Sequence, residues 1–141
     1  MKTSYNWSGK TILIVEDDDP SFIYVSEIIK TFHPIVVRCK SGLVAFFQCM
    51  NYPFPDLVLM DIKLPEMSGY DSTRLIKKYQ PNIPIIALTA CAMQEEKQKC
   101  FLAGCDEYLT KPIFPKDLIY AIGCYLSNDV LNISDKELTL S

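Results

Sequence analysis

Acidic residues gather where apolar segments of this sequence end. An apolar run over residues 12–15 leads directly into the four acidic residues 16–19, and a second apolar run ends at Asp61. Clustered like charges repel one another unless they hold a cation, and Mg²⁺ is a hard cation that prefers carboxylate oxygens. The pattern therefore indicates either a solvated acidic loop or a cation site.

Two more polar residues, Thr89 and Lys111, each follow a predicted strand further along the chain. Either residue alone is typical of an ordinary polar loop. Beside a cation and clustered carboxylates, however, an ammonium group and a hydroxyl would contact phosphoryl oxygens while a carboxylate attacks phosphorus. This set of residue types therefore indicates phosphoryl transfer to a carboxylate.

The segments that must position these residues alternate between two periods. Short apolar runs typical of buried strands cover residues 11–15, 35–39, 56–61, 83–88 and 106–110. Helical spacing predicts helices over 20–32, from 41 to the proline at 53, and over 70–79, 94–102 and 114–126. This alternation predicts a parallel sheet with helices on both faces, whose ligands bind beyond the carboxyl ends of the strands. We therefore expect the polar residues above at one edge of the sheet.

Local signals refine several of these elements. Asp18 and Asp19 stand where the first helix begins, and negative charge there meets the positive end of the helix dipole, so we interpret both as capping residues. Gly104 is a typical left-handed residue at the end of the fourth helix. The second helix carries three large apolar residues on one face, namely Val44, Phe47 and Met50.

Composition limits the class of protein. The 141 residues suit one domain, and a net charge of −3 with a pI near 5.1 argues against direct binding of nucleic acid. No apolar run is long enough to span a membrane and the N-terminus lacks a signal-peptide core, so we expect a cytoplasmic location. The six cysteines form no CxxC pair and we expect most of them to be reduced core residues.

Four motifs give the chain a family resemblance. They are VEDDDP after the first strand, LVLMDIKLPEMSG around Asp61, IIALTA at the fourth strand and DEYLTKPI at the fifth. In this order they resemble the receiver domain of two-component response regulators over residues 11–126, with a leader or junction at 1–10 and a tail at 127–141. The resemblance implies an α/β, flavodoxin-like (βα)5 three-layer sandwich with strand order 2-1-3-4-5.

The resemblance also implies a role for each site residue. Asp61 would be the phospho-acceptor, taking a phosphoryl group from a phosphohistidine and switching the partner-binding surface. Thr89 and Lys111 would contact the phosphoryl group, Tyr108 would rotate inward on activation, and the Lys111–Pro112 bond would be cis. Mg²⁺, with Mn²⁺ as a substitute, would be held by Glu16, Asp17, Asp61 and the backbone carbonyl of Lys63.

The implied partners are a sensor histidine kinase or a His-containing phosphotransfer protein, and a downstream protein on the face formed by the fourth helix, fifth strand and fifth helix. A homodimer on activation is a further expectation, whereas nucleic acid and membrane are not expected as direct partners. The domain would catalyse only its own phosphorylation and dephosphorylation. The motif Trp7-Ser8-Gly9-Lys10 resembles the junction before receivers in hybrid kinases, so a stand-alone protein and a hybrid-kinase fragment both stay open.

Three other functions are alternatives to this interpretation. An aspartyl phosphohydrolase usually carries a second Asp two residues after its nucleophile, where this chain has Lys63. A pure interaction module would have no need of the complete set of polar residues. A P-loop site is excluded because Ser8-Gly9-Lys10 precedes the first strand and lacks the leading glycine. For Tyr108, an ordinary strand residue with a solvated hydroxyl is the alternative to a switch.

Overall fold

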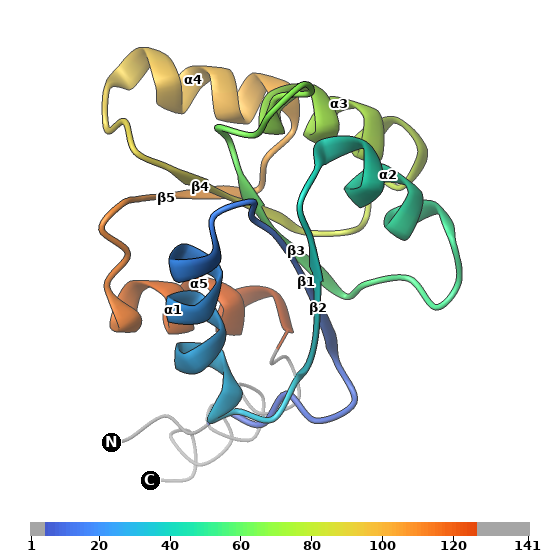
Figure 1. Ribbon diagram of the computed structural model, residues 1–141, viewed down its shortest axis with the longest axis vertical. Coiled ribbons are helices and arrows are strands. Elements are labelled where there is room, and N and C mark those ends of the chain that lie inside the picture. The colour runs from blue at the N-terminus through green and yellow to red at the C-terminus, as the bar shows by residue number, and fades with distance from the viewer. Residues whose placement is uncertain (1–4, 127–141) are drawn as a thin grey trace, which may run out of the picture.

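One parallel sheet of five strands forms the centre of the molecule in a computed structural model that describes residues 5–126 (Figure 1). The strand order is β2-β1-β3-β4-β5, which confirms the predicted order and fold class. The strands are β1 (Thr11–Val15), β2 (Ile35–Cys39), β3 (Leu57–Asp61), β4 (Ile85–Thr89) and β5 (Glu107–Thr110).

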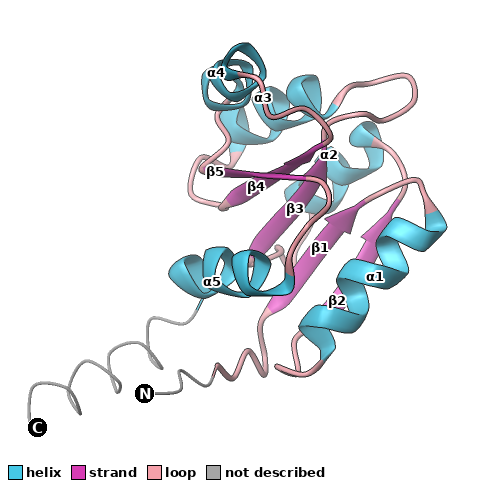
Figure 2. Cartoon of the chain, turned by 90° about the vertical axis from the view of Figure 1, so that its left-hand side faces the viewer, coloured by secondary structure: helices cyan, strands magenta, loops and turns pink. Residues whose placement is uncertain are grey.

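Five helices cover the sheet in two layers. They are α1 (Asp19–Lys30), α2 (Gly42–Met50), α3 (Gly69–Tyr79), α4 (Gln94–Ala103) and α5 (Pro115–Leu126). Helices α1 and α5 lie on one face, and α2, α3 and α4 lie on the other (Figures 1 and 2). All ten elements were predicted, and their ends move only slightly, as is usual for element boundaries. Within residues 5–126, every helix is too short or too polar to cross a bilayer.

Alternate residues of each strand feed two separate apolar layers. In β1, Ile12 and Ile14 join the cluster under α1 and α5, whereas Leu13 and Val15 join the cluster under α2, α3 and α4. Every residue of β3 and of β4 is buried. Because these strands are covered on both faces, they appear in the sequence as continuous apolar runs that end at the site residues.

The segment before β1 contributes to the core. Trp7 is fully buried, and its ring packs against those of Tyr5 and Phe32 with centroid distances of 5.7 and 4.7 Å. The backbone N–H of Trp7 donates to the carbonyl oxygen of Phe32, two residues after α1 ends. The predicted leader over 1–10 therefore supplies core residues from Tyr5 onward. The predicted tail over 127–141 lies outside the described residues.

Two of the three residues expected on the apolar face of α2 are exposed in the structure, whereas the third, Met50, is partly buried against the core. Val44 and Phe47 are 45% and 52% exposed, and the helix buries its small residues Gly42, Ala45 and Cys49. Small side chains let α2 approach α3 closely, and the Ser72 hydroxyl donates to the Gly42 carbonyl at 2.7 Å. The bulky side chains of Val44 and Phe47 do not take part in that contact and lie on the outer face.

The structure agrees with the predicted end residues of α1 and α4 and with the predicted reduced cysteines. Asp18 is the N-cap of α1, since its carboxylate accepts from the backbone N–H of Ser21, and Gly104 closes α4 with a φ of +110°. Asp19 lies in the first turn of α1, as expected, but its side chain pairs with Arg38 of β2 and with Lys40 just after that strand. All six cysteines are free, and four are buried: Cys39, Cys49, Cys100 and Cys105.

Candidate functional site

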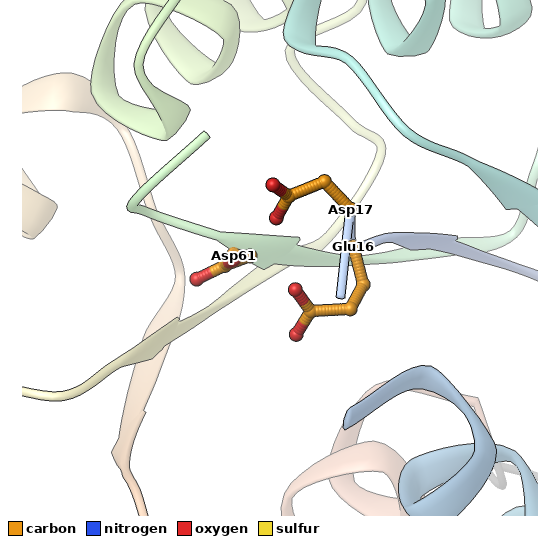
Figure 3. A group of neighbouring side chains, drawn as sticks. All are labelled: Glu16, Asp17 and Asp61. Atoms are coloured by element: carbon orange, nitrogen blue, oxygen red, sulfur yellow. The ribbon is translucent and has the colours of Figure 1, made fainter. Parts of the chain in front are cut away.

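The polar residues that follow the strands meet at one edge of the sheet. Glu16 follows β1, Asp61 ends β3, Thr89 ends β4 and Lys111 follows β5. One carboxylate oxygen from each of Glu16, Asp17 and Asp61 lies within 4.8 Å of the other two (Figure 3). The parallel topology brings these groups together from distant parts of the chain, as the sequence predicts.

The three acidic residues differ in their exposure to solvent. Glu16 and Asp61 are only 2% and 4% exposed, whereas Asp17 is exposed at the rim. Two buried carboxylates side by side are costly without a compensating positive charge. The only charged nitrogen that the described residues bring to both carboxylates belongs to Lys111, 3.3 Å from Glu16 Oε1 and 3.5 Å from Asp61 Oδ1.

The ionisation of Glu16 and Lys111 reflects this crowding. Burial raises the pKa of Glu16 to about 7, and its hydrogen bond with Asp61 and the charge of Asp61 add to the rise, while Lys111 opposes it. Burial acts to lower the pKa of Lys111, but the negative charges of Asp61 and Glu16 outweigh it and the pKa is raised. Lys111 therefore stays charged in the site.

Backbone groups fix the orientation of the remaining site residues. The N–H of Lys63 donates to Asp61 Oδ1 at 3.3 Å, and the N–H of Cys91 donates to the Thr89 hydroxyl at 3.2 Å. The N–H of Lys111 donates to the Thr89 carbonyl at 2.7 Å, and the Lys111–Pro112 bond is cis, as predicted. Both Thr89 and Lys111 are thus held at the carboxyl end of the sheet beside Asp61.

Gly69 allows the chain to pass closely over the end of β3. Its N–H donates to the carbonyl of Ile62 at 2.8 Å, and a Cβ at this position would collide with the carbonyl oxygen of Asp61. Only glycine therefore permits α3 to begin directly above the acidic site. The motif around Asp61 includes Gly69, but the sequence alone gave no reason for this residue.

Tyr108 packs against α4 in this structure. Its half-buried ring lies 6.0 Å from the ring of Phe101, nearly perpendicular to it, and the ammonium group of Lys97 lies 5.4 Å from its centroid. The ring therefore joins β5 to the outer part of α4. The switch role expected of Tyr108 is a separate matter and stays a prediction.

The donor set fits a hard divalent cation. Three carboxylates, two of them buried, can offer oxygens to one point, and hard oxygen donors are the ligands that Mg²⁺ takes in proteins. A divalent cation would also offset the negative charge that Lys111 balances only in part. Residues Glu16, Asp17 and Asp61 therefore match the chemistry expected of a magnesium site.

Comparison with known proteins assigns the family. The family model of the response regulator receiver domain matches residues 12–123. The chain belongs to this receiver family. It is accordingly a signalling domain of two-component systems, which work with histidine kinases or phosphotransfer proteins.

Individual relatives resemble the receiver over most of its length. The polar-differentiation response regulator DivK of Brucella ovis is 36% identical over 121 residues, which cover 84% of this chain and 98% of DivK. Hybrid signal transduction histidine kinase G of Dictyostelium discoideum is 38% identical over 122 residues, which cover 81% of this chain but only 3% of that kinase. The same fold thus occurs in a short regulator and inside a long kinase.

A solved receiver structure shares the fold of this chain. The receiver domain of a sensor histidine kinase from Pseudomonas aeruginosa, with a magnesium ion coordinated in its active-site cleft, superposes with a TM-score of 0.78 at 30% identity. The match covers 86% of this chain and 100% of that domain. A relative with the same fold therefore holds magnesium in its cleft.

Proposed function

We propose that the receiver takes a phosphoryl group from a phosphohistidine onto Asp61 and thereby changes its partner-binding surface. The observation that carries the proposal is the setting of Asp61, a buried carboxylate at the end of β3 with the ammonium group of Lys111 at 3.5 Å. The phosphohistidine belongs to a sensor histidine kinase or to a His-containing phosphotransfer protein.

The proposed transfer exchanges one bond for another. A carboxylate oxygen of Asp61 attacks phosphorus, the bond between phosphorus and the histidine nitrogen breaks, and the nitrogen keeps the electron pair and takes a proton from solvent. Bound Mg²⁺ supplies charge neutralisation for the phosphoryl oxygens. Glu16, Asp17, Asp61 and the carbonyl of Lys63 are the proposed ligands, and Mn²⁺ offers the same preference for oxygen.

Lys111 and Thr89 are proposed to bind the transferred group. The Lys111 ammonium already contacts a carboxylate oxygen of Asp61, so it can form an ion pair with a phosphoryl group attached there. The Thr89 hydroxyl has its oxygen fixed by the N–H of Cys91 and can donate its proton to a phosphoryl oxygen. The receiver itself, with these residues, would accelerate both its phosphorylation and its later hydrolysis.

The proposed output surface is the face formed by α4, β5 and α5. Movement of Thr89 toward the phosphoryl group would leave room for Tyr108 to turn inward, which would break its contacts with Phe101 and Lys97 on α4. Beside Tyr108, a groove of about 430 Å³ runs between β5 and α5 and is lined by Asp117, Tyr120 and Tyr125. A downstream protein, or a second copy on activation, would bind here.

The first experiment measures phosphate uptake on intact protein by mass spectrometry after incubation with acetyl phosphate and Mg²⁺. We expect the wild-type chain to gain one phosphoryl group and Asp61→Asn to gain none. Asp71→Asn is the matched control, because Asp71 is an exposed carboxylate on α3, and it should react as the wild type does. Equal uptake by Asp61→Asn would overturn the assignment of the acceptor.

The second experiment tests the switch with beryllofluoride and Mg²⁺, which imitate the phosphoryl group. Amide and side-chain NMR signals of Thr89 and Tyr108 should shift, together with those of Phe101 across the contact. Signals of residues at the opposite end of the sheet from the site, such as Phe32, should not shift. Binding without any change at Tyr108 would support an ordinary strand residue instead of a switch.

A further inference from the structure

Arg38 reaches from β2 across to the loop that carries the acidic residues. Its Nε donates to the backbone carbonyl of Glu16 at 3.2 Å, and its Nη2 forms a close ion pair with Asp19 Oδ1 at 2.7 Å. The guanidinium also lies over the ring of Phe22, 4.4 Å from the centroid. One side chain therefore links β2 to the start of α1 and to the backbone of the site.

These contacts bear on Asp17, although Arg38 does not touch its side chain. The peptide before Asp17 contains the Glu16 carbonyl, which accepts from Arg38. The peptide after Asp17 contains the N–H of Asp18, which donates to Glu16 Oε2 at 3.3 Å. Both peptide groups that flank Asp17 are thus held by hydrogen bonds. Its own carboxylate stands exposed at the rim of the site.

We propose that Arg38 is a positioning residue of the cation site, which holds the Glu16–Asp17 peptide so that the Asp17 carboxylate faces Glu16 and Asp61. The proposal rests on the proposed magnesium site. An exposed carboxylate on an otherwise free loop would lose conformational entropy on binding the cation, and a fixed backbone avoids part of that cost. Groups that orient metal ligands typically change metal affinity by about 10–100-fold when removed.

The positive charge of Arg38 acts in the opposite direction. A cation beside the site repels Mg²⁺, so removal of the charge alone would strengthen metal binding. The ion pair with Asp19 offsets most of this charge at short distance, and Lys40 lies 3.6 Å from the same carboxylate oxygen. The two effects therefore change the Mg²⁺ affinity of an Arg38 variant in opposite directions. The proposal requires that loss of the backbone contact has the larger effect.

The chain offers a matched control in Lys40. Lys40 pairs with Asp19 as Arg38 does, and it is exposed, but only Arg38 donates to the Glu16 carbonyl among the hydrogen bonds of the described residues. Lys40→Met therefore removes a positive charge from the same place without removal of the backbone contact. Arg38→Lys keeps the charge but has only a single ammonium, which does not span both contacts as the planar guanidinium does.

The experiment is an NMR titration of the full ¹⁵N-labelled chain with MgCl₂, with metal affinity read from the amide signals of Asp17 and Lys63. We expect Arg38→Met to weaken Mg²⁺ binding about tenfold and Arg38→Lys to weaken it less. Lys40→Met should stay within about twofold of the wild type, as an exposed charge does. An Arg38→Met protein that binds Mg²⁺ as tightly as the wild type, or more tightly, would overturn the proposal.

A second measurement needs no metal. Hydrogen exchange of the Asp18 amide in EDTA should accelerate in Arg38→Met and stay unchanged in Lys40→Met, because only the first variant releases the loop. Unchanged exchange in Arg38→Met would also count against the proposal. A wild-type chain that binds no Mg²⁺ would overturn the proposed metal site together with this inference. Normal wild-type binding with an unaffected Arg38→Met protein would overturn the inference alone.

Discussion

Lys111 and Glu16 form an ion pair with 3.3 Å between Nζ and Oε1, although 95 positions separate them in the chain. Lys111 offsets the negative charge of Glu16 only in part, because the same ammonium group also contacts Asp61. The pKa of Glu16 is consequently raised to about 7, first by burial and then by Asp61.

This raised pKa predicts how stability of the metal-free protein depends on pH. The folded state binds a proton at Glu16 more tightly than the unfolded chain, whose Glu pKa is about 4.3. The stabilisation is fully present below that value and is lost as the pH rises through about 7. We expect urea unfolding in EDTA, followed by circular dichroism, to show this loss in the wild type. Glu16→Gln should reduce it, and an identical pH profile for the variant would contradict the assignment.

Gly69→Ala should destabilise the protein and disturb the site. The new Cβ collides with backbone atoms of Asp61 and Ile62, which have little freedom to move, so we expect a loss of about 1–3 kcal/mol in unfolding free energy. Gly9→Ala is the control, because Gly9 has open space around it and only its φ of +81° disfavours alanine. Urea unfolding gives the energies, and amide signals of Asp61 and Lys63 should shift only in Gly69→Ala. Unshifted site signals in that variant would contradict the steric argument.

Asp106→Ala should lower the free energy of unfolding by more than the removal of a fully exposed ion pair does. The Asp106 carboxylate accepts from the backbone N–H of Ile85 at 2.8 Å and from Lys77 at 2.7 Å. Asp106 itself lies at the surface, but Ile85 is buried and Lys77 is partly buried. Hydrogen bonds to a charged group contribute about 1.5–3 kcal/mol, and we expect a loss in that range. Glu27→Ala removes an exposed pair with Lys30 and should cost below about 0.5 kcal/mol. If chemical unfolding gave equal losses of free energy for Asp106→Ala and Glu27→Ala, the Asp106 contacts would contribute no more to stability than an exposed pair.

Thiol alkylation should separate the six cysteines into two groups. Burial raises the pKa of Cys39 to about 11 and of Cys49 and Cys105 to about 12, so these thiols carry very little thiolate near neutral pH and are also shielded. We expect iodoacetamide at pH 8 to modify Cys124 first and the buried thiols only after addition of urea. Peptide mass spectrometry reads the order of modification. Early modification of Cys49 in native buffer would contradict the packing under α2.

Strands and site residues could be predicted from the sequence for one physical reason. Strands buried on both faces must be apolar throughout, so a polar residue at the end of such a run stands out, as Asp61 does after β3. The parallel topology then brings all such ends to one edge, so the constellation of Glu16, Asp61, Thr89 and Lys111 follows without any knowledge of distances.

Contacts between distant elements could not be predicted in this way. Helical spacing in α2 marks Val44 and Phe47 as an apolar face, but the buried side is chosen by how closely α3 approaches, which depends on small residues. Arg38 gave a local signal, a charged residue inside an apolar strand, but its partners on the β1–α1 loop are visible only in three dimensions. The burial of Trp7 likewise depends on α1 ending beside it.

The position of Trp7 has an optical consequence. The only tryptophan of the chain lies before β1, whereas the acidic site lies beyond the other end of that strand, about 16 Å of strand length away. Its intrinsic fluorescence should therefore follow unfolding of the domain and stay almost constant when the site changes its occupancy. A dye on Cys91, which is partly exposed two residues after Thr89, would supply the complementary signal once Cys124 is replaced by serine. Folding and signalling could then be recorded at two wavelengths in one cuvette.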